Sequence, residues 1–162
     1  MLEEIRGTGG SSKVNSFSFK TPSLKKLQLT NPNYNASVTL ENTTAYPNLN
    51  EVNFSGSNLS NIKLNNLNIT ALNISNIRNP NSEITIQNCS KLKTFSYSNL
   101  NIRTLSFSDC YIKNLNFTNT NLTKLEITSK CRSTITINNV ANLREITLNG
   151  FSEVTINNCS NL

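Results

Sequence analysis

The chain has 162 residues, a mass of 18.0 kDa and a formal net charge of +6, with its 15 basic and nine acidic residues spread along its length. Asparagine makes up about a fifth of the residues, and Ser and Thr are also abundant. These residues disfavour helices, whereas the Leu, Ile, Val and Phe that supply the apolar content suit strands, so the composition predicts an all-β protein. No apolar stretch approaches the roughly 18 residues of a membrane span, so none is predicted.

Residues 1–12 are predicted to be a flexible N-terminal segment or linker. Met1 to Arg6 is acidic where a secretory signal would be basic and then apolar, so the chain as written carries no export signal. The Gly- and Ser-rich stretch from Gly7 to Ser12 has the composition of a flexible joint. The first six residues are therefore expected to be a detached tail or the end of another element.

A single apolar pattern, apolar-x-x-apolar-x-apolar, then recurs to the end of the chain, with central residues usually ten or eleven apart. The complete copies are Val14/Phe17/Phe19, Leu24/Leu27/Leu29, Leu49/Val52/Phe54, Leu59/Ile62/Leu64, Ile69/Leu72/Ile74, Leu92/Phe95/Tyr97, Ile102/Leu105/Phe107, Ile112/Leu115/Phe117, Leu122/Leu125/Ile127 and Leu143/Ile146/Leu148. Weaker copies keep the last two positions: Val38/Leu40, Ile84/Ile86, Ile135/Ile137 and Val154/Ile156. Each copy predicts a short strand, and prolines and most glycines fall between the copies.

The spacing inside each copy favours a solenoid over an antiparallel meander. The last two apolar residues point to the same side of a strand, and the mostly polar residue between them faces solvent. The first apolar residue would face solvent in a meander, but it can turn inward at the corner of a coil. Residues 13–162 are therefore predicted to form a right-handed β-solenoid with about 21 residues per coil and two short parallel strands per coil.

The cysteines mark the coil length. Cys89, Cys110 and Cys131 recur at intervals of 21, and Cys89, Cys110 and Cys159 each lie five residues after a central strand residue. Leucine-rich repeats place an Asn or Cys ladder at this point after L-x-x-L-x-L. The segments Cys89-Ser90-Lys91-Leu92 and Cys159-Ser160-Asn161-Leu162 also resemble the C-x-x-L joint of such repeats.

Residues 12–162 thus resemble bacterial leucine-rich-repeat proteins of the internalin and BspA-like kinds. The array departs from them because the strand motif recurs every half-coil and Cys131 is one residue out of phase. Cys89, Cys110, Cys131 and Cys159 are predicted to form a buried structural ladder, with disulfides or a metal site as alternatives. A zinc site lacks a ligand set because the chain has no histidine and no C-x-x-C pair.

Catalysis is not predicted, and no cofactor is expected. The sequence has no histidine, only one aspartate and no Gly-rich phosphate loop. A catalytic carboxylate pair could come from four glutamates, which are Glu83, Glu126, Glu145 and Glu153. We expect these glutamates to be solvated surface residues.

Basic residues recur between the first two apolar positions of the copies. Lys93 and Lys113 are expected on one side of neighbouring coils, and Arg103 and Lys124 on the opposite side. They form either a solubilising edge or a row that contacts acidic glycans, anionic cell-surface polymers or a protein. Specific nucleic-acid binding is not predicted, because no exposed aromatic platform accompanies the charges.

Two functions follow as expectations. The first is a non-enzymatic leucine-rich-repeat binding module for adhesion or for protein or glycan interaction, at a bacterial cell surface or outside the cell. The alternative is a structural component of a larger assembly, such as a phage tail or virion protein. Because solenoids need capped ends and the last repeat joint falls at Leu162, the array is expected to continue beyond the C-terminus or to meet a partner there.

Overall fold

A computed structural model describes residues 2–7, 16–17, 21–30, 35–118 and 120–162, excepting the side chains of Ser16, Phe17 and Cys131. The apolar positions Val14 and Phe19 lie outside this description. Within the described residues there are thirteen strands and no helix. The strands are β1 (Glu4–Gly7), β2 (Ser16–Phe17), β3 (Lys26–Leu29), β4 (Ser37–Glu41), β5 (Glu51–Asn53), β6 (Asn61–Asn65), β7 (Ala71–Asn73), β8 (Glu83–Gln87), β9 (Thr94–Ser96), β10 (Thr104–Cys110), β11 (Leu115–Thr118), β12 (Lys124–Asn138) and β13 (Glu145–Asn157).

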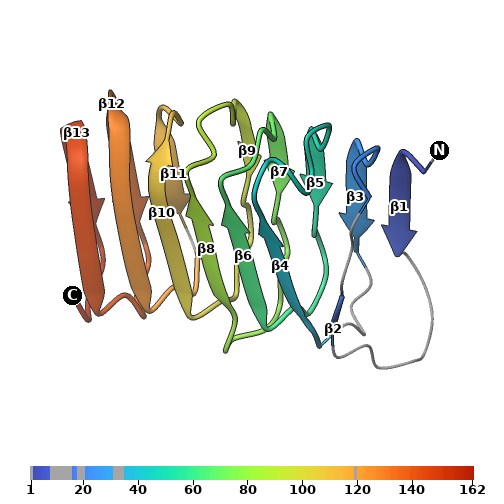
Figure 1. Ribbon diagram of the computed structural model, residues 1–162. Coiled ribbons are helices and arrows are strands. Elements are labelled where there is room, and N and C mark those ends of the chain that lie inside the picture. The colour runs from blue at the N-terminus through green and yellow to red at the C-terminus, as the bar shows by residue number, and fades with distance from the viewer. Residues whose placement is uncertain (1, 8–15, 18–20, 31–34, 119) are drawn as a thin grey trace.

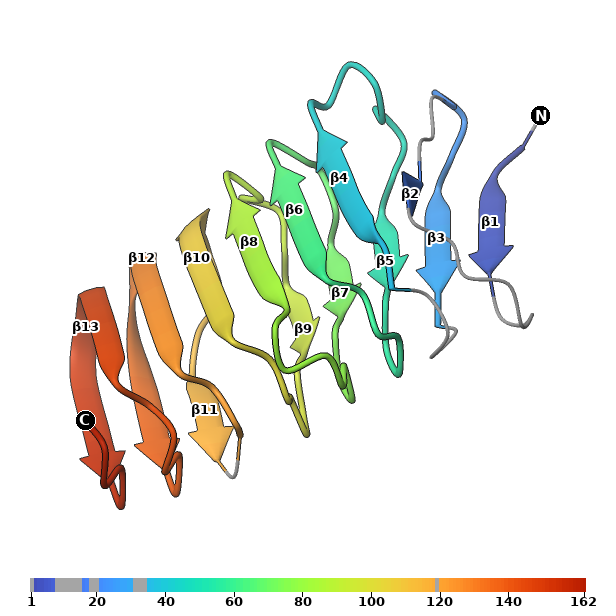
Figure 2. The ribbon, with the colours of Figure 1, turned by 90° about the horizontal axis from the view of Figure 1, so that it is seen from below.

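The strands form two parallel walls of one solenoid of about six turns (Figures 1 and 2). Wall A contains β1, β3, β5, β7 and β9, and wall B contains β2, β4, β6, β8 and β10. β12 and β13 each turn through a corner: their first halves continue wall B beside β10, and their second halves pair alongside β11 (Figure 2). Paired residues in neighbouring coils lie about 21 positions apart, as Glu83 and Thr104 do, which confirms the predicted coil.

The core between the walls is formed by the apolar positions of the repeat. The corner residues of the complete copies from the second copy onward are all buried, as the solenoid prediction requires: Leu24, Leu49, Leu59, Ile69, Leu92, Ile102, Ile112, Leu122 and Leu143. Pairing between neighbouring strands is parallel throughout, which excludes the antiparallel meander. The inner coils of the described part therefore bury apolar residues from both walls and from their corners.

Many strands are followed within three residues by an asparagine in the left-handed conformation, which Asn tolerates better than most residues. Asn42, Asn66, Asn76, Asn88, Asn99, Asn139 and Asn158 all have φ between 52° and 77°. The turned backbone N–H still reaches the next coil: that of Asn88 donates to the carbonyl of Ser108 at 3.1 Å. Several of these side chains also bond from coil to coil, as the amide of Asn88 does to Oδ1 of Asn65 at 3.0 Å.

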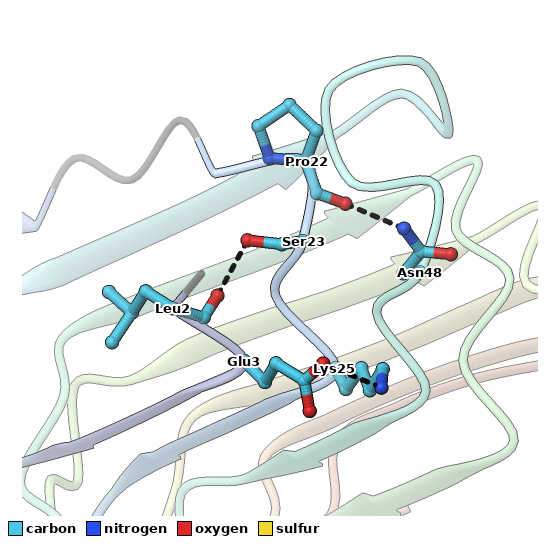
Figure 3. A network of polar contacts seen from close by, with 6 residues as sticks. All are labelled: Leu2, Glu3, Pro22, Ser23, Lys25 and Asn48. Atoms are coloured by element: carbon cyan, nitrogen blue, oxygen red, sulfur yellow. Dashed lines mark hydrogen bonds and ion pairs between the residues drawn. The ribbon is translucent and has the colours of Figure 1, made fainter.

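The described N-terminal residues belong to the stack. β1 lies within the segment 1–12 and pairs with β3, where Ile5 packs against the core. Side chains reinforce this pairing (Figure 3): Ser23 Oγ donates to the Leu2 carbonyl at 2.7 Å, and Lys25 Nζ lies 2.8 Å from Glu3 Oε1. The apolar pattern does not reveal this strand because Ile5 is followed two positions later by glycine. Residues 8–12 of the predicted linker lie outside the described part of the chain.

Candidate binding surfaces

Arg103 and Lys124, predicted to form one basic row, both lie on wall B. Arg103 Nη1 is 3.5 Å from Glu83 Oε1, and Lys124 Nζ is 2.9 Å from Glu126 and 3.1 Å from Glu145. The two glutamates raise the pKa of Lys124, with the hydrogen bond to Glu126 as the larger cause. Wall B therefore carries neighbouring charges of both signs at these positions.

These side chains line a hollow on the outer face of wall B, which we name the mixed-charge hollow. Its volume is about 780 Å³, and its charged lining consists of Glu83, Arg103, Lys124, Glu126, Arg144 and Glu145. The coil register places them together, because Thr104 pairs with Glu83 on one side and with Lys124 on the other, and Lys124 pairs with Glu145. Polar Thr85, Gln87 and Ser106 lie among the charges. The hollow can thus offer both donors and acceptors to a ligand.

Three of the four glutamates considered as possible carboxylate pairs form ion pairs with basic side chains. Glu83, Glu126 and Glu145 each contact a cation, and Glu153 is exposed on β13. Among the described residues no group of three or more His, Cys, Asp or Glu side chains could hold a metal ion. The same part of the chain contains no helix with the length and apolarity needed to cross a membrane.

Lys93 lies immediately before β9, and Lys113 lies two residues before β11. Both side chains are exposed, and neither forms an ion pair with any described residue. They therefore differ from the basic residues of wall B, and they provide a natural comparison when the charges of the mixed-charge hollow are tested.

Two of the predicted ladder cysteines are buried at equivalent positions of neighbouring coils. The thiol of Cys89 donates to the carbonyl of Gln87 at 3.4 Å, and that of Cys110 to the carbonyl of Ser108 at 3.3 Å. The Cys89 thiol, followed by burial, raises the pKa of Cys110 well above its usual range. Cys159 is half-buried, and Cys131 lies in β12 with its side chain outside the described set.

An opening follows β9, the last strand of wall A, and the apolar repeat pattern does not predict it. β9 pairs with β7, but within the described residues no strand pairing joins β9 to β11 in the next coil. Instead the backbone N–H of Asn116 donates to the hydroxyl of Tyr97 at 2.7 Å. The Tyr97 ring packs 4.7 Å from both Phe95 and Phe117, centroid to centroid. Tyr97 is thus the side chain that stands between the two coils.

This opening is a cleft of about 490 Å³ without charged side chains. We name it the hydroxyl cleft; its lining is Ser75, Ser96, Tyr97, Ser98, Asn99, Asn116, Thr118 and Thr120. Thr120 is only 4% exposed, and its hydroxyl has no hydrogen-bond partner among the described residues. The available signal in the sequence is Tyr97 itself, because every other copy of the repeat has Leu, Ile or Phe at its last inward position. A phenol there cannot be packed like an aliphatic side chain without a partner for its hydroxyl.

The geometry defines the class of the protein as a parallel β-solenoid with a mixed-charge hollow on one wall and an uncharged cleft on the other. A scan against protein-family models gave no match, and comparisons with curated proteins and with solved structures gave none either.

Proposed function

We propose that the chain is a non-enzymatic binding module that uses the mixed-charge hollow to contact a protein or glycan at a bacterial surface or outside the cell. Leucine-rich-repeat character and right-handed winding are part of this proposal. The cysteine positions and the L-x-x-L-x-L copies support it. Fold alone does not define a function, so the argument rests on the surface.

The observation that carries the proposal is the alignment of six charged side chains over successive coils of wall B. Stacked coils hold them on a rigid support, so little conformational entropy is lost when a partner binds. Their ion pairs are solvent-exposed, with Lys124 and Glu145 side chains 38% and 69% accessible. Such exposed pairs contribute only about 0–1 kcal/mol to folding, so the charges are free to exchange partners.

The test compares the effect on binding of reversing charges in the mixed-charge hollow with the effect of reversing charges outside it. The double variant Arg103→Glu/Lys124→Glu is compared with the matched control Lys93→Glu/Lys113→Glu, which has the same change in net charge. Both are assayed against an array of acidic and neutral glycans and against a panel of purified cell-surface proteins. We expect the wall B variant alone to lose binding, and we expect the binding of the natural chain to weaken as salt is raised. Equal binding by both variants would show that the hollow is not the contact surface.

A structural role in a larger assembly, such as a phage tail or virion protein, is the second candidate. The observation in its favour is the exposure of apolar side chains on β13, where Val154 is 46% and Ile156 38% accessible. Exposed apolar residues on an edge strand favour association with another chain. Analytical ultracentrifugation tests this role: association that depends on concentration, and that Val154→Lys/Ile156→Lys abolishes, would favour it. A monomer at all concentrations would argue against it.

A further inference from the structure

We propose that the hydroxyl cleft between β9 and β11 binds a neutral sugar residue. The cleft lies at the end of wall A, between β9 and β11, and shares no lining residue with the mixed-charge hollow, so this site stands independently of the proposed function. Three observations carry the inference: an interrupted backbone ladder, a buried hydroxyl without a partner among the described residues, and a lining that contains no charge.

The interruption of the ladder is local to one pair of coils. In the preceding coils the N–H of Phe54 donates to the carbonyl of Asn73, and that of Ile74 to the carbonyl of Ser96, each at 2.8 Å. The equivalent bond, from the N–H of Tyr97 to the carbonyl of Asn116, is not formed within the described residues, and the N–H of Asn116 donates to the Tyr97 hydroxyl. Beside the cleft the N–H of Tyr97 therefore lacks this backbone partner among the described residues.

Two hydroxyls give the cleft its binding chemistry. The hydroxyl of Thr120, buried and without a partner among the described residues, can both donate and accept a hydrogen bond. The hydroxyl of Tyr97 already accepts from Asn116, so its own hydrogen is available to an acceptor. Burial raises the pKa of Tyr97, which keeps this hydrogen in place at neutral and mildly alkaline pH. A ligand that offers both acceptors and donors would satisfy both groups.

The lining selects the class of ligand. Ser, Thr, Tyr and Asn side chains supply hydroxyls and amides, and no cation is present to bind a phosphate or carboxylate. An apolar ligand would leave the Thr120 hydroxyl unpaired, at a cost in free energy. A sugar hydroxyl both donates and accepts, and the volume of 490 Å³ falls within the about 300–1,000 Å³ of small-molecule sites. Because Phe95 and Phe117 cover the Tyr97 ring, no aromatic face is free for stacking, and we expect millimolar affinity.

The experiment is a titration of the isotopically labelled full chain, followed by the NMR shifts of its backbone amides. The probes are maltose, cellobiose and diacetylchitobiose, with sodium sulfate and trialanine as the anionic and peptide comparisons. We expect at least one disaccharide to shift the amides of residues 96–99 and 116–120 selectively and saturably. Absence of shifts with all three disaccharides, or equal shifts with sulfate or trialanine, would overturn the proposal.

A substitution at Thr120 sharpens the test. Thr120→Val keeps the shape but removes the unpartnered hydroxyl, so we expect sugar affinity to fall by about tenfold, the equivalent of one hydrogen bond. The melting temperature of the sugar-free protein should stay the same or rise, because the lost hydroxyl had no partner. Thr39→Val, at an exposed position of β4 that lines neither the cleft nor the mixed-charge hollow, is the matched control and should leave sugar binding unchanged. Unaltered affinity in Thr120→Val, or an equal loss in Thr39→Val, would refute the assignment.

Discussion

Gly150 in β13 lies directly against the backbone of Ser129 in the preceding coil. A Cβ added to Gly150 would collide with the carbonyl oxygen of Ser129, and the glycine has a φ of +81°. The contact falls where β12 and β13 turn from wall B towards wall A. At this corner two coils approach so closely that only a residue without a side chain fits.

Gly150→Ala is therefore expected to destabilise the C-terminal coils by about 2–4 kcal/mol, because the left-handed conformation and the collision both oppose a side chain. Chemical denaturation, with the free energy of unfolding extrapolated to water, measures the effect. Gly56→Ala is the matched control: its φ is also positive, at +71°, but the nearest atom is 3.8 Å from the added Cβ. It should cost only about 1 kcal/mol, and an equal loss for the two variants would contradict the collision.

Asn88→Ala should reduce the free energy of unfolding by about 1–2 kcal/mol, because alanine disfavours the φ of 53° and cannot replace the side-chain bond to Asn65. Asn88→Gly should recover most of this loss, since glycine adopts the conformation freely. Thermal and chemical unfolding of the two variants measures the difference. If the glycine variant were the less stable, the side-chain bond would matter more than the backbone conformation.

Leu105→Ala should destabilise the protein by about 2–5 kcal/mol, because Leu105, the second residue of β10, is fully buried. Ser106→Ala, at the next position on the outer face of the same strand, should change stability by no more than about 0.5 kcal/mol. Urea denaturation of both variants tests the inward and outward assignment. Similar effects at the two positions would show that Leu105 and Ser106 do not point inward and outward, respectively.

The thiols should react in a defined order. Cys159 is half-buried and should be alkylated first in the native protein, whereas Cys89 and Cys110 are buried and should react only as the coils open. Peptide mapping by mass spectrometry after timed alkylation identifies each site. Rapid labelling of Cys89 under native conditions would exclude a buried ladder.

The Cys110 pKa also predicts how stability varies with pH. An unfolded cysteine ionises near about 8.5, whereas folded Cys110 keeps its proton to higher pH because the Cys89 thiol and burial favour the neutral form. Above about 8.5 folded Cys110 binds more protons than unfolded Cys110, so its contribution to the free energy of unfolding should fall as pH rises, whereas the lowered pKa of Cys89 acts in the opposite direction. Cys110→Ser, compared by denaturation across this range, should flatten the dependence. An unchanged slope in that variant would assign the effect to other groups.

The sequence by itself predicted the solenoid: its period-two alternation places the residues of each strand, and its corner leucines and isoleucines favour a closed coil over an antiparallel meander. The predicted coil length and parallel strands are confirmed, as is the burial of most apolar positions in the described residues, although Val154 and Ile156 on β13 are exposed. Local pattern could not reveal β1, where a glycine replaces the second inward residue.

Only the tertiary structure decided how the surfaces are arranged. In the sequence, Arg103 and Lys124 suggest a basic row. In the structure, Arg103 pairs with a glutamate one coil away, and Lys124 pairs with one glutamate on the same strand and another in the next coil, so the surface carries both charges. The hydroxyl cleft depends on Tyr97 meeting Asn116 about one coil later. The physical reason is that a repeat fixes which side chains point inward, whereas charge pairing and coil separation depend on neighbours about 20 residues away in the sequence.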